Sequence, residues 1–427
     1  MAGTYTPTTA RTDLVNAWKE TYLALQPAIR VLAEELDWFD DIPDAKVDWS
    51  TYQTILPLDI YRAFGFGAVS EGGYKTRPSS KSVERATIDL QHYNVSFTMS
   101  ELANWADKGL GNQVKQQIKL QGTQKFATMA RGLANYLHGT SVGTLFLTDT
   151  DIAGASTATL TLHSGYGNSA ITDGTFMTNL VEVGDQVALV DGSSLVANSI
   201  PATITAKTPA TPSIAISTTS NVTVSNNNLK VVLANSLEEA TLAGGSDYNK
   251  GLVGVQDWLF STTVHGKSSS SITDWSVARG VSSGGRYTPV KHRALKDAIY
   301  NEAPPQYAQP NRWMVAQGVY RDAMDYQRVG LRFEDAMEMT IDGDIKSKGL
   351  KVLSTKRVMP GLSCLFHGNA VGKIMLTPMP DADGGLSWSD GEKLENRSAK
   401  RFDIDVVVGT VCRARKAFAY ETGLTEQ

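Results

Sequence analysis

The chain has 427 residues, a formal net charge of −4 at pH 7 and a sequence pI near 5.9. This length exceeds that of a usual single domain, so two or three compact units are expected. The acidic balance argues against a protein built to neutralise a nucleic-acid backbone, and no run of residues approaches the roughly 18 apolar residues of a membrane-spanning helix.

The amino terminus is polar and rich in Thr, without the basic start and apolar run of a signal peptide. We therefore expect a protein made in a cytoplasm. Thr12 or Asp13 can cap a first helix that contains Leu14, Trp18 and Leu25, and a second short helix follows Pro27.

Residues 55–99 predict a long β-hairpin. Two apolar-rich arms, 55–69 and 83–99, are joined by a tip rich in Gly, Pro and Ser that carries charges of both signs. At about 3.3 Å per residue the arms would extend roughly 50 Å. Because an isolated two-stranded ribbon is only marginally stable in water, we expect a neighbouring subunit to cover it.

Residues 110–138 predict one long amphipathic helix. Apolar residues recur at spacings of three, four or eight and so share one face, which includes Val114, Ile118, Phe126 and Leu133. Gly139 is predicted to end this helix in a left-handed conformation.

The composition changes after this helix. No Arg occurs between Arg131 and Arg279, and from residue 140 to 245 the only lysines are Lys207 and Lys230. The segment is rich in Thr, Ser, Val, Ala and Asn and predicts short strands at 157–162, 186–190, 202–206, 214–217, 222–224 and 230–234. This spacing is typical of a small antiparallel barrel or sandwich that is inserted between mixed segments.

Beyond residue 251 the pattern is mixed again. Residues 290–302 and 319–327 predict helices, and 313–316, 350–355, 363–367 and 371–376 predict strands. A last long strand at 402–408 alternates Phe402, Ile404, Val406 and Val408 with two aspartates, and it can extend to Cys412.

The sequence predicts no catalytic or metal site and no cofactor. The six histidines never fall at metal-ligand spacing, so we interpret them as structural residues. The Asp pairs at 342–344 and 381–383 lack a complete calcium loop and predict solvated turns. Cys364 and Cys412 match no metal or redox spacing and are expected to be reduced core thiols.

In this order the elements resemble the major capsid (coat) proteins of tailed bacteriophages with the Hong Kong 97-like fold. Residues 94–102, Asn-Val-Ser-Phe-Thr-Met-Ser-Glu-Leu, lead into the helix that ends Tyr136-Leu-His-Gly139. The second stretch is 349–372, with Gly349-Leu-Lys-Val-Leu-Ser-Thr355 and Leu365-Phe-His-Gly368, followed by strand 402–408 and Arg413. These are packing motifs, and their order makes the resemblance specific.

The resemblance implies an α+β fold with an N-terminal arm, an extended β-hairpin loop, a long spine helix, and peripheral and axial domains. The β-rich block departs from the minimal family and resembles an inserted domain. The expected boundaries are the N-terminal arm at 1–49, the extended loop at 50–99, the spine helix and start of the peripheral domain at 100–144, the inserted β-rich domain at 145–245, the axial domain with return strands at 246–375, and the peripheral C-terminal strands at 376–427.

The implied function is structural rather than enzymatic: self-assembly into an icosahedral or prolate head shell, the virion capsid, around double-stranded DNA. Head-to-tail contacts would repeat in pentamers and hexamers. Partners would be a portal, a separate scaffolding protein, an optional decoration protein and the packaged DNA through weak non-specific contact, with no membrane. Synthesis would take place in the bacterial host cytoplasm.

Two groups of residues are candidates for these contacts. The first, in the extended loop, would form ion pairs between subunits: Glu71, Lys75, Arg77, Lys81, Glu84 and Arg85. The second would face the lumen and the DNA: Arg11, Lys19, Lys115, Lys119 and Lys125. In each group a solvated charged surface is the alternative, and exposed pairs stabilise by at most about 1 kcal/mol. Family members with covalent crosslinks exist, but no acceptor for Lys75 or Lys81 matches, so non-covalent assembly is expected.

Two other classes remain open on the sequence alone. One is an encapsulin-like nanocompartment shell protein, which shares the fold and would enclose a cargo enzyme instead of DNA. The other is a β-rich carbohydrate-binding or hydrolytic protein, suggested by the Thr- and Ser-rich block and the eight tryptophans. An enzyme of that kind needs paired carboxylates in a cleft.

Overall fold

The computed structural model divides the chain into two compact units. One comprises Met1–Asp44, Leu90–Ala134 and Lys373–Gly409, and the other comprises Ala45–Asp89, Asn135–Gly372 and Thr410–Gln427. The structure describes residues 42–43, 53–58, 85–100, 129, 131–141, 143–148, 150–163, 180–191, 194–196, 202–209, 211, 213–224, 229–233, 251–330, 350–354, 357–376, 386–388, 392–393 and 399–425.

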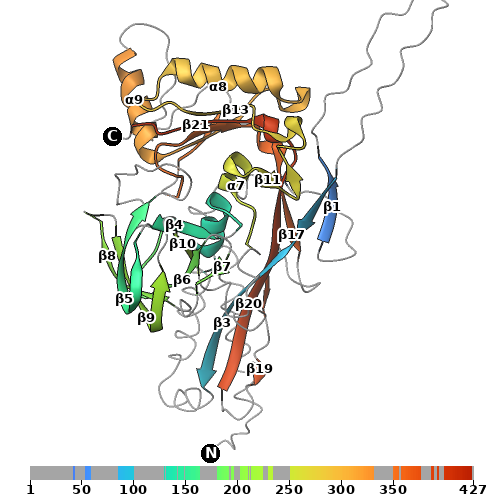
Figure 1. The fold of residues 1–427 in the computed structure, drawn as a ribbon. Coiled ribbons are helices and arrows are strands. Elements are labelled where there is room, and N and C mark those ends of the chain that lie inside the picture. The colour runs from blue at the N-terminus through green and yellow to red at the C-terminus, as the bar shows by residue number, and fades with distance from the viewer. Residues whose placement is uncertain are drawn as a thin grey trace, which may run out of the picture. The chain divides into compact units, whose positions relative to one another are not determined.

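Two long antiparallel strands organise the first unit. β3 (Gln91–Ser100) pairs with β20 (Ala399–Cys412) from Gln91 opposite Val408 to Ser100 opposite Ala399 (Figure 1). β18 (Leu386–Trp388) and β19 (Glu392–Lys393) also pair with β20, and β17 (Val371–Leu376) is its neighbour in the sheet. The strand predicted at 402–408 is confirmed and is longer than its alternating core.

The structure corrects the predicted hairpin. β1 (Gln53–Pro57) pairs with β2 (Arg85–Asp89), from Gln53 opposite Asp89 to Pro57 opposite Arg85, which is the base of a hairpin. Residues 91–99, predicted to continue the second arm, instead belong to β3 and pair with β20. The alternating pattern of residues 83–99 identifies strands but not their partner, and Leu90 separates the two strands. Residues 59–84, for which the rest of the hairpin was predicted, lie outside the described residues.

The predicted long helix is confirmed where it is described. Residues 131–138 are helical, with Ala134, Tyr136 and Leu137 buried, while residues 110–128 lie outside the described residues. Gly139 follows the helix as expected, and its N–H donates to the Asn135 carbonyl at 2.9 Å. The expected left-handed conformation is wrong, because Gly139 is not among the residues with positive φ. A Cβ at this position would instead lie 2.7 Å from the Asn135 carbonyl oxygen.

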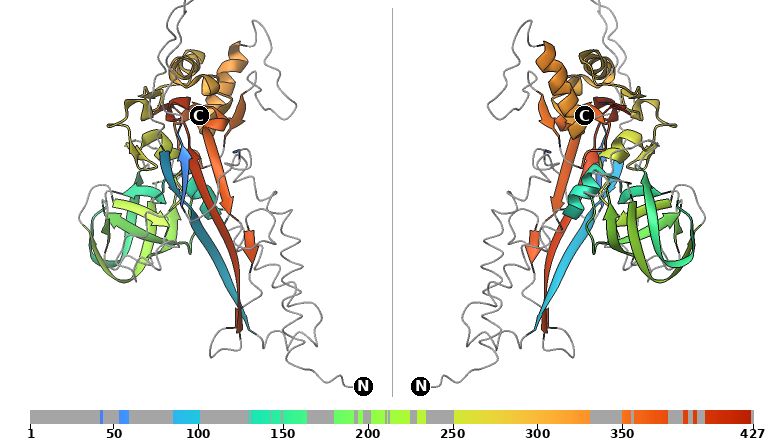
Figure 2. Two further views of the ribbon diagram at one scale, coloured as in Figure 1. Left: turned by 90° about the vertical axis from the view of Figure 1, so that its right-hand side faces the viewer. Right: turned by 90° about the vertical axis from the view of Figure 1, so that its left-hand side faces the viewer.

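The β-rich segment forms a closed antiparallel barrel. Its strands are β4 (Thr144–Thr148), β5 (Ile152–His163), β6 (Gln186–Asp191), β7 (Ser194–Leu195), β8 (Ala202–Thr208), β9 (Ser213–Val224) and β10 (Leu229–Leu233). They are ordered β10-β4-β5-β9-β8-β6-β7, and β10 also pairs with β6, which closes the ring. In both views of Figure 2 these green strands curve around one another.

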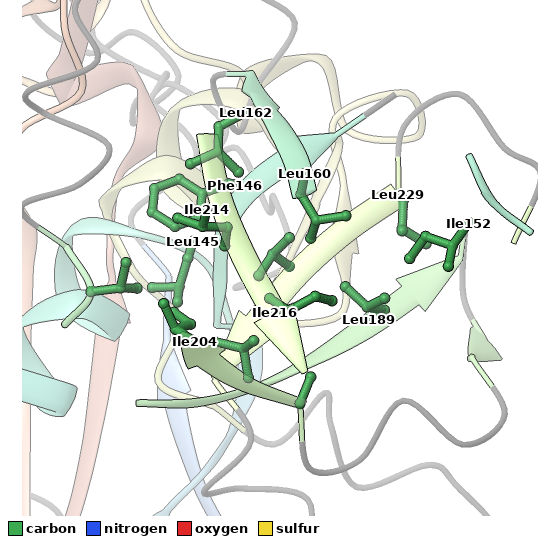
Figure 3. Packing of buried hydrophobic residues seen from close by; sticks show 14 of the residues in the cluster. Leu145, Phe146, Ile152, Leu160, Leu162, Leu189, Ile204, Ile214, Ile216 and Leu229 are labelled. Carbon is green, nitrogen blue, oxygen red and sulfur yellow. The ribbon is translucent and has the colours of Figure 1, made fainter. Parts of the chain in front are cut away.

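Alternation along the strands builds the barrel core. In β5, Leu160 and Leu162 are buried while Thr159 and Thr161 are exposed. The inward residues pack into one cluster with Phe146, Leu189, Ile204, Ile214, Ile216 and Leu229 (Figure 3). Each strand predicted in this segment overlaps an observed strand, but the two strands predicted at 214–217 and 222–224 are one continuous strand, β9. β4, β7 and the first half of β5 were not predicted.

A five-stranded sheet carries the rest of the second unit. Its order is β13 (Arg279–Ser282), β21 (Phe418–Thr422), β16 (Ser363–Phe366), β14 (Arg312–Val315) and β15 (Lys351–Leu353). Two helices belong with it, α8 (Pro289–Glu302) and α9 (Gln317–Gly330), and a short helix α7 (Val255–Phe260) follows the barrel. α8 buries Leu295 and Ile299 and contacts β21 and β16. The helices and strands predicted beyond residue 251 are therefore confirmed.

Candidate functional site

Most predicted contact residues lie outside the described part of the chain. Of the extended-loop group only Arg85 is described, exposed at the start of β2; Glu71, Lys75, Arg77, Lys81 and Glu84 lie outside. The whole lumen-facing group, Arg11, Lys19, Lys115, Lys119 and Lys125, lies outside as well, as do the Asp pairs at 342–344 and 381–383. Their roles stay predictions.

Sequence reasoning missed a backbone junction where the chain enters and leaves the barrel. The Gly251 N–H, after the barrel, donates to the Ser141 carbonyl, before it, at 2.8 Å. The Gln256 N–H donates to the Gly139 carbonyl at 3.1 Å. Two segments more than a hundred residues apart in sequence are therefore held side by side at the end of the 131–138 helix.

Glycines allow this close approach. A Cβ at Gly254 would lie 2.2 Å from the Tyr136 carbonyl oxygen and 2.5 Å from that of Gly139, and a Cβ at Gly251 would lie 2.3 Å from the Ser141 carbonyl oxygen. Real Cβ atoms do not approach backbone oxygen so closely, so these two positions require glycine on steric grounds. The spacing Gly251–Gly254 is a sequence signal for close packing, although it does not identify the partner.

A buried carboxylate completes the junction. Asp257 accepts a hydrogen bond from the Ser141 N–H at 2.5 Å and is 7% exposed. Burial raises the pKa of Asp257 to about 6, and hydrogen bonds from the backbone of Ser141 and Gly254 partly oppose that rise. The carboxylate thus links α7 to the segment that enters the barrel.

Arg415 ties the segments after the barrel together. Its guanidinium donates from Nε to the Trp258 carbonyl at 2.9 Å, from Nη1 to the Trp275 carbonyl at 3.1 Å and from Nη2 to the Ser261 carbonyl at 2.8 Å. Burial lowers its pKa from the usual value. A buried Arg whose hydrogen bonds go to backbone carbonyls fixes loop positions and leaves little capacity for binding a ligand.

Ion pairs hold the connection between β13 and α8. Lys291 Nζ lies 3.0 Å from the buried Glu421 Oε1 and donates to the Ser283 hydroxyl at 2.8 Å and to the Gly284 carbonyl at 2.6 Å. Arg286 Nε donates to the buried Asp322 on α9 at 2.7 Å. The start of α8 is therefore tied both to the sheet and to α9.

Aromatic packing fixes the same connection. Tyr287 stacks on Trp313 with ring centroids 5.5 Å apart, and its hydroxyl lies 2.8 Å from His292 Nδ1. Trp313 Nε1 donates to the Ser363 hydroxyl at 2.9 Å. Burial raises the pKa of Tyr287 and lowers that of His292 to about 4, so both side chains are neutral near pH 7.

Two histidines accept hydrogen bonds from backbone amides. His265 accepts from the Cys412 N–H at 3.0 Å, and His367 accepts from the Asn369 N–H at 3.2 Å. Cys364 and Cys412 are free and buried. The described residues contain no group of His, Cys, Asp and Glu that would hold a metal, and no described helix is long and apolar enough to cross a membrane.

Comparison with known proteins identifies the fold. No family model matches the chain, and no curated protein matches it in sequence. Among solved structures, a chain of the cyanophage A-1(L) capsid asymmetric unit matches at a TM-score of 0.51 and 8% identity, covering 90% of this chain and 92% of that chain. The expectation of a phage capsid fold is thereby confirmed over nearly the whole chain.

Two further solved structures align with lower TM-scores. A chain from the procapsid of satellite phage P4, determined with its size determination (Sid) protein, has a TM-score of 0.40 and 10% identity and covers 94% of this chain and 90% of that chain. The SrpI encapsulin of Synechococcus elongatus PCC 7942 has a TM-score of 0.28 and 14% identity and covers 34% of this chain and 53% of that chain.

Proposed function

We propose that this chain is the major capsid protein of a tailed bacteriophage, a structural subunit that self-assembles into the icosahedral or prolate head shell around double-stranded DNA. The observation that carries the proposal is the chain-wide fold likeness to a cyanophage capsid chain, which covers about nine-tenths of both proteins. The order of sequence elements independently leads to the same family.

Assembly, rather than turnover, is the proposed mechanism. Each subunit would contact its neighbours head to tail in pentamers and hexamers, and many modest contacts would act together. The paired strands β1 and β2 form the base of the extended loop, and a two-stranded ribbon gains stability when another surface covers it. We propose that a neighbouring subunit supplies that surface, with the loop charges from Glu71 to Arg85 forming ion pairs across the contact.

We also propose that residues 145–245 form an inserted domain on the outer face of the shell. The closed barrel has its own apolar core, and its entry and exit are hydrogen-bonded to each other, which is the geometry that an insertion needs. Its carboxylates outnumber its two lysines, Lys207 and Lys230, so its surface would repel DNA; they include Asp149, Asp151, Asp173, Glu182, Asp185 and Asp191.

The remaining partners follow from the shell proposal. The lumen would be lined by the basic residues from Arg11 to Lys125 that contact DNA without reading its sequence. A portal, a separate scaffolding protein and, in some particles, a decoration protein would complete the head. The chain itself would be located in the virion capsid after synthesis in the host cytoplasm.

Expression of the full chain, with and without a co-expressed scaffold, tests the proposal. Size-exclusion chromatography and electron microscopy should show closed particles in the megadalton range. A small oligomer under both conditions would contradict a shell function. Shells purified from the native host that contain a protein cargo and no DNA would support the encapsulin-like alternative.

A further inference from the structure

The outward face of α8 carries two large exposed apolar side chains. Val290 is 74% exposed and Tyr300 is 64% exposed, although both lie on a helix that buries Leu295 and Ile299 on its other side. Arg293 and Asp297, also exposed, lie between them on the same face. Single exposed apolar residues need no explanation, so the spacing of the four residues decides whether they form a surface.

The spacing is that of a helix-packing seam. Residues 290, 293, 297 and 300 are separated by three, four and three positions, which places them along one side of the helix as at the a and d positions of a heptad. A second helix that packs along this seam would cover both apolar residues. The two charges would then form the centre of the contact.

The seam is complementary to the same seam on a second, antiparallel copy of α8. In an antiparallel pair of α8 helices centred on Leu295, Val290 of one copy lies opposite Tyr300 of the other, and Arg293 lies opposite Asp297. The pairing is isologous, so the Val290–Tyr300 contact and the Arg293–Asp297 ion pair each occur twice, related by a twofold axis. A parallel pair would place Arg293 beside Arg293 and Asp297 beside Asp297.

We propose that α8 is a contact surface for a second copy of this chain, in an antiparallel α8–α8 pair centred on Leu295. The inference rests on the proposed shell function, which supplies the many copies, and adds the partner of one defined surface. The ion pairs of Lys291 and Arg286 and the stacking of Tyr287 on Trp313 hold the start of α8 in place before contact, which lowers the entropy cost of docking.

The contact is small. α8 has 14 residues and is about 21 Å long, so the pair falls in the class of weak interfaces below about 1,200 Å². It therefore contributes as one of many repeated contacts in an assembly. Its specificity comes from the opposed charges, because like charges at a close interface are strongly unfavourable.

Charge reversal tests the pairing directly. The variants Arg293→Asp and Asp297→Arg each place like charges opposite each other, and sedimentation velocity of the purified full chain under conditions that prevent shell closure should show self-association weakened at least about tenfold. An equimolar mixture of the two variants restores both ion pairs in the mixed dimer and should associate as the wild type does. The control Lys296→Glu changes an exposed charge of α8 that flanks the seam and is level with the uncharged Ala294 of the other copy, so it should weaken self-association much less than either reversal.

Three outcomes would overturn the inference: wild-type chain with no self-association outside shells, single reversals that associate like the wild type, or a mixture that associates no better than its components. Circular dichroism of each variant confirms that the chain is folded. If these outcomes occur while the wild type still forms closed particles, the α8 pairing is wrong and the shell function stands.

Discussion

The amide nitrogen of Gly251 and the carbonyl oxygen of Ser141 are 2.8 Å apart, although the whole barrel lies between them in sequence. This one hydrogen bond places the exit of the barrel beside its entry. The segments before and after the barrel can therefore pack together without a long connection between them.

The barrel should be removable. Replacement of residues 144–250 by a short Gly-Ser linker should leave a cooperatively folded chain, because the two ends of the deletion are already adjacent. The isolated fragment 143–250 should give the dispersed amide spectrum of a folded β protein, because its apolar core is its own. Thermal melting by circular dichroism checks the deletion variant, and an NMR spectrum checks the isolated fragment. A disordered spectrum for the fragment would contradict the proposed independent domain.

Gly254→Ala should strongly destabilise the chain. The new Cβ would lie 2.2 Å from a backbone oxygen of Tyr136, and backbone cannot move aside easily. We expect a loss of about 2 to 3 kcal/mol in the free energy of unfolding by denaturant titration. Gly132→Ala in the adjacent helix is the matched control: nothing lies within 4 Å of its Cβ position, so it should stabilise by up to about 1 kcal/mol. Equal effects at the two positions would refute the steric argument.

Lys291→Ala should lower the free energy of unfolding more than Lys416→Ala does. The first leaves the buried carboxylate of Glu421 without its cation, and we expect a loss of about 2 kcal/mol. The second breaks the pair with Glu302, whose side chain is 44% exposed, and should cost less than about 1 kcal/mol. Denaturant unfolding of both variants tests the difference. A loss that is no larger for Lys291 would show that burial of Glu421 does not depend on this pair.

Asp257 should make stability fall as pH rises from about 4 to 6. Its folded pKa, about 6, is above the ordinary value of 3.8, so the folded chain binds the proton more tightly and loses this advantage once the group ionises. The difference in unfolding free energy between the wild type and Asp257→Asn isolates the effect, and this difference should change by roughly 2 kcal/mol between pH 4 and pH 7. His265 and His292, with pKa values lowered to about 4, act in the opposite direction in both proteins. A difference that does not change with pH would contradict the raised pKa.

Deletion of the loop tip should separate folding from assembly. Removal of residues 71–81 should leave a soluble, folded subunit that fails to close normal shells, because the proposed intersubunit surface of the ribbon is lost. Electron microscopy and thermal melting measure the two properties separately. Particles of wild-type size and stability from the deleted chain would show that the tip has no role in assembly.

Local patterns predicted the elements well and their partners poorly. The alternation of Thr159, Leu160, Thr161 and Leu162 predicts a half-buried strand, and the barrel contains it. The alternation in residues 91–99 is equally clear, yet it fits any antiparallel partner, so a continuous hairpin arm was predicted where the structure pairs β3 with β20, some three hundred residues away.

The junction was not predictable for a related reason. Ser141, Gly251 and Gly254 have no periodic pattern, and their contacts depend on backbone groups that every residue carries. Arg415 is likewise a charged residue, and sequence alone predicts that such a residue is exposed to solvent. In the structure it is buried, and hydrogen bonds to three backbone carbonyls compensate the loss of hydration of its guanidinium. Such positions are determined by tertiary structure alone.

The pairing of the first and last strands of the barrel has a kinetic consequence. Thr144 of β4 lies opposite Val232 of β10, so this one ladder, wherever it forms first, would bring the two ends of the segment together. Loop closure then costs the surrounding chain only the entropy of a short connection rather than that of about a hundred residues. A barrel that folds early thus lowers the effective contact order of everything around it, and we expect the surrounding chain to fold faster with the barrel present than with an unstructured segment of equal length.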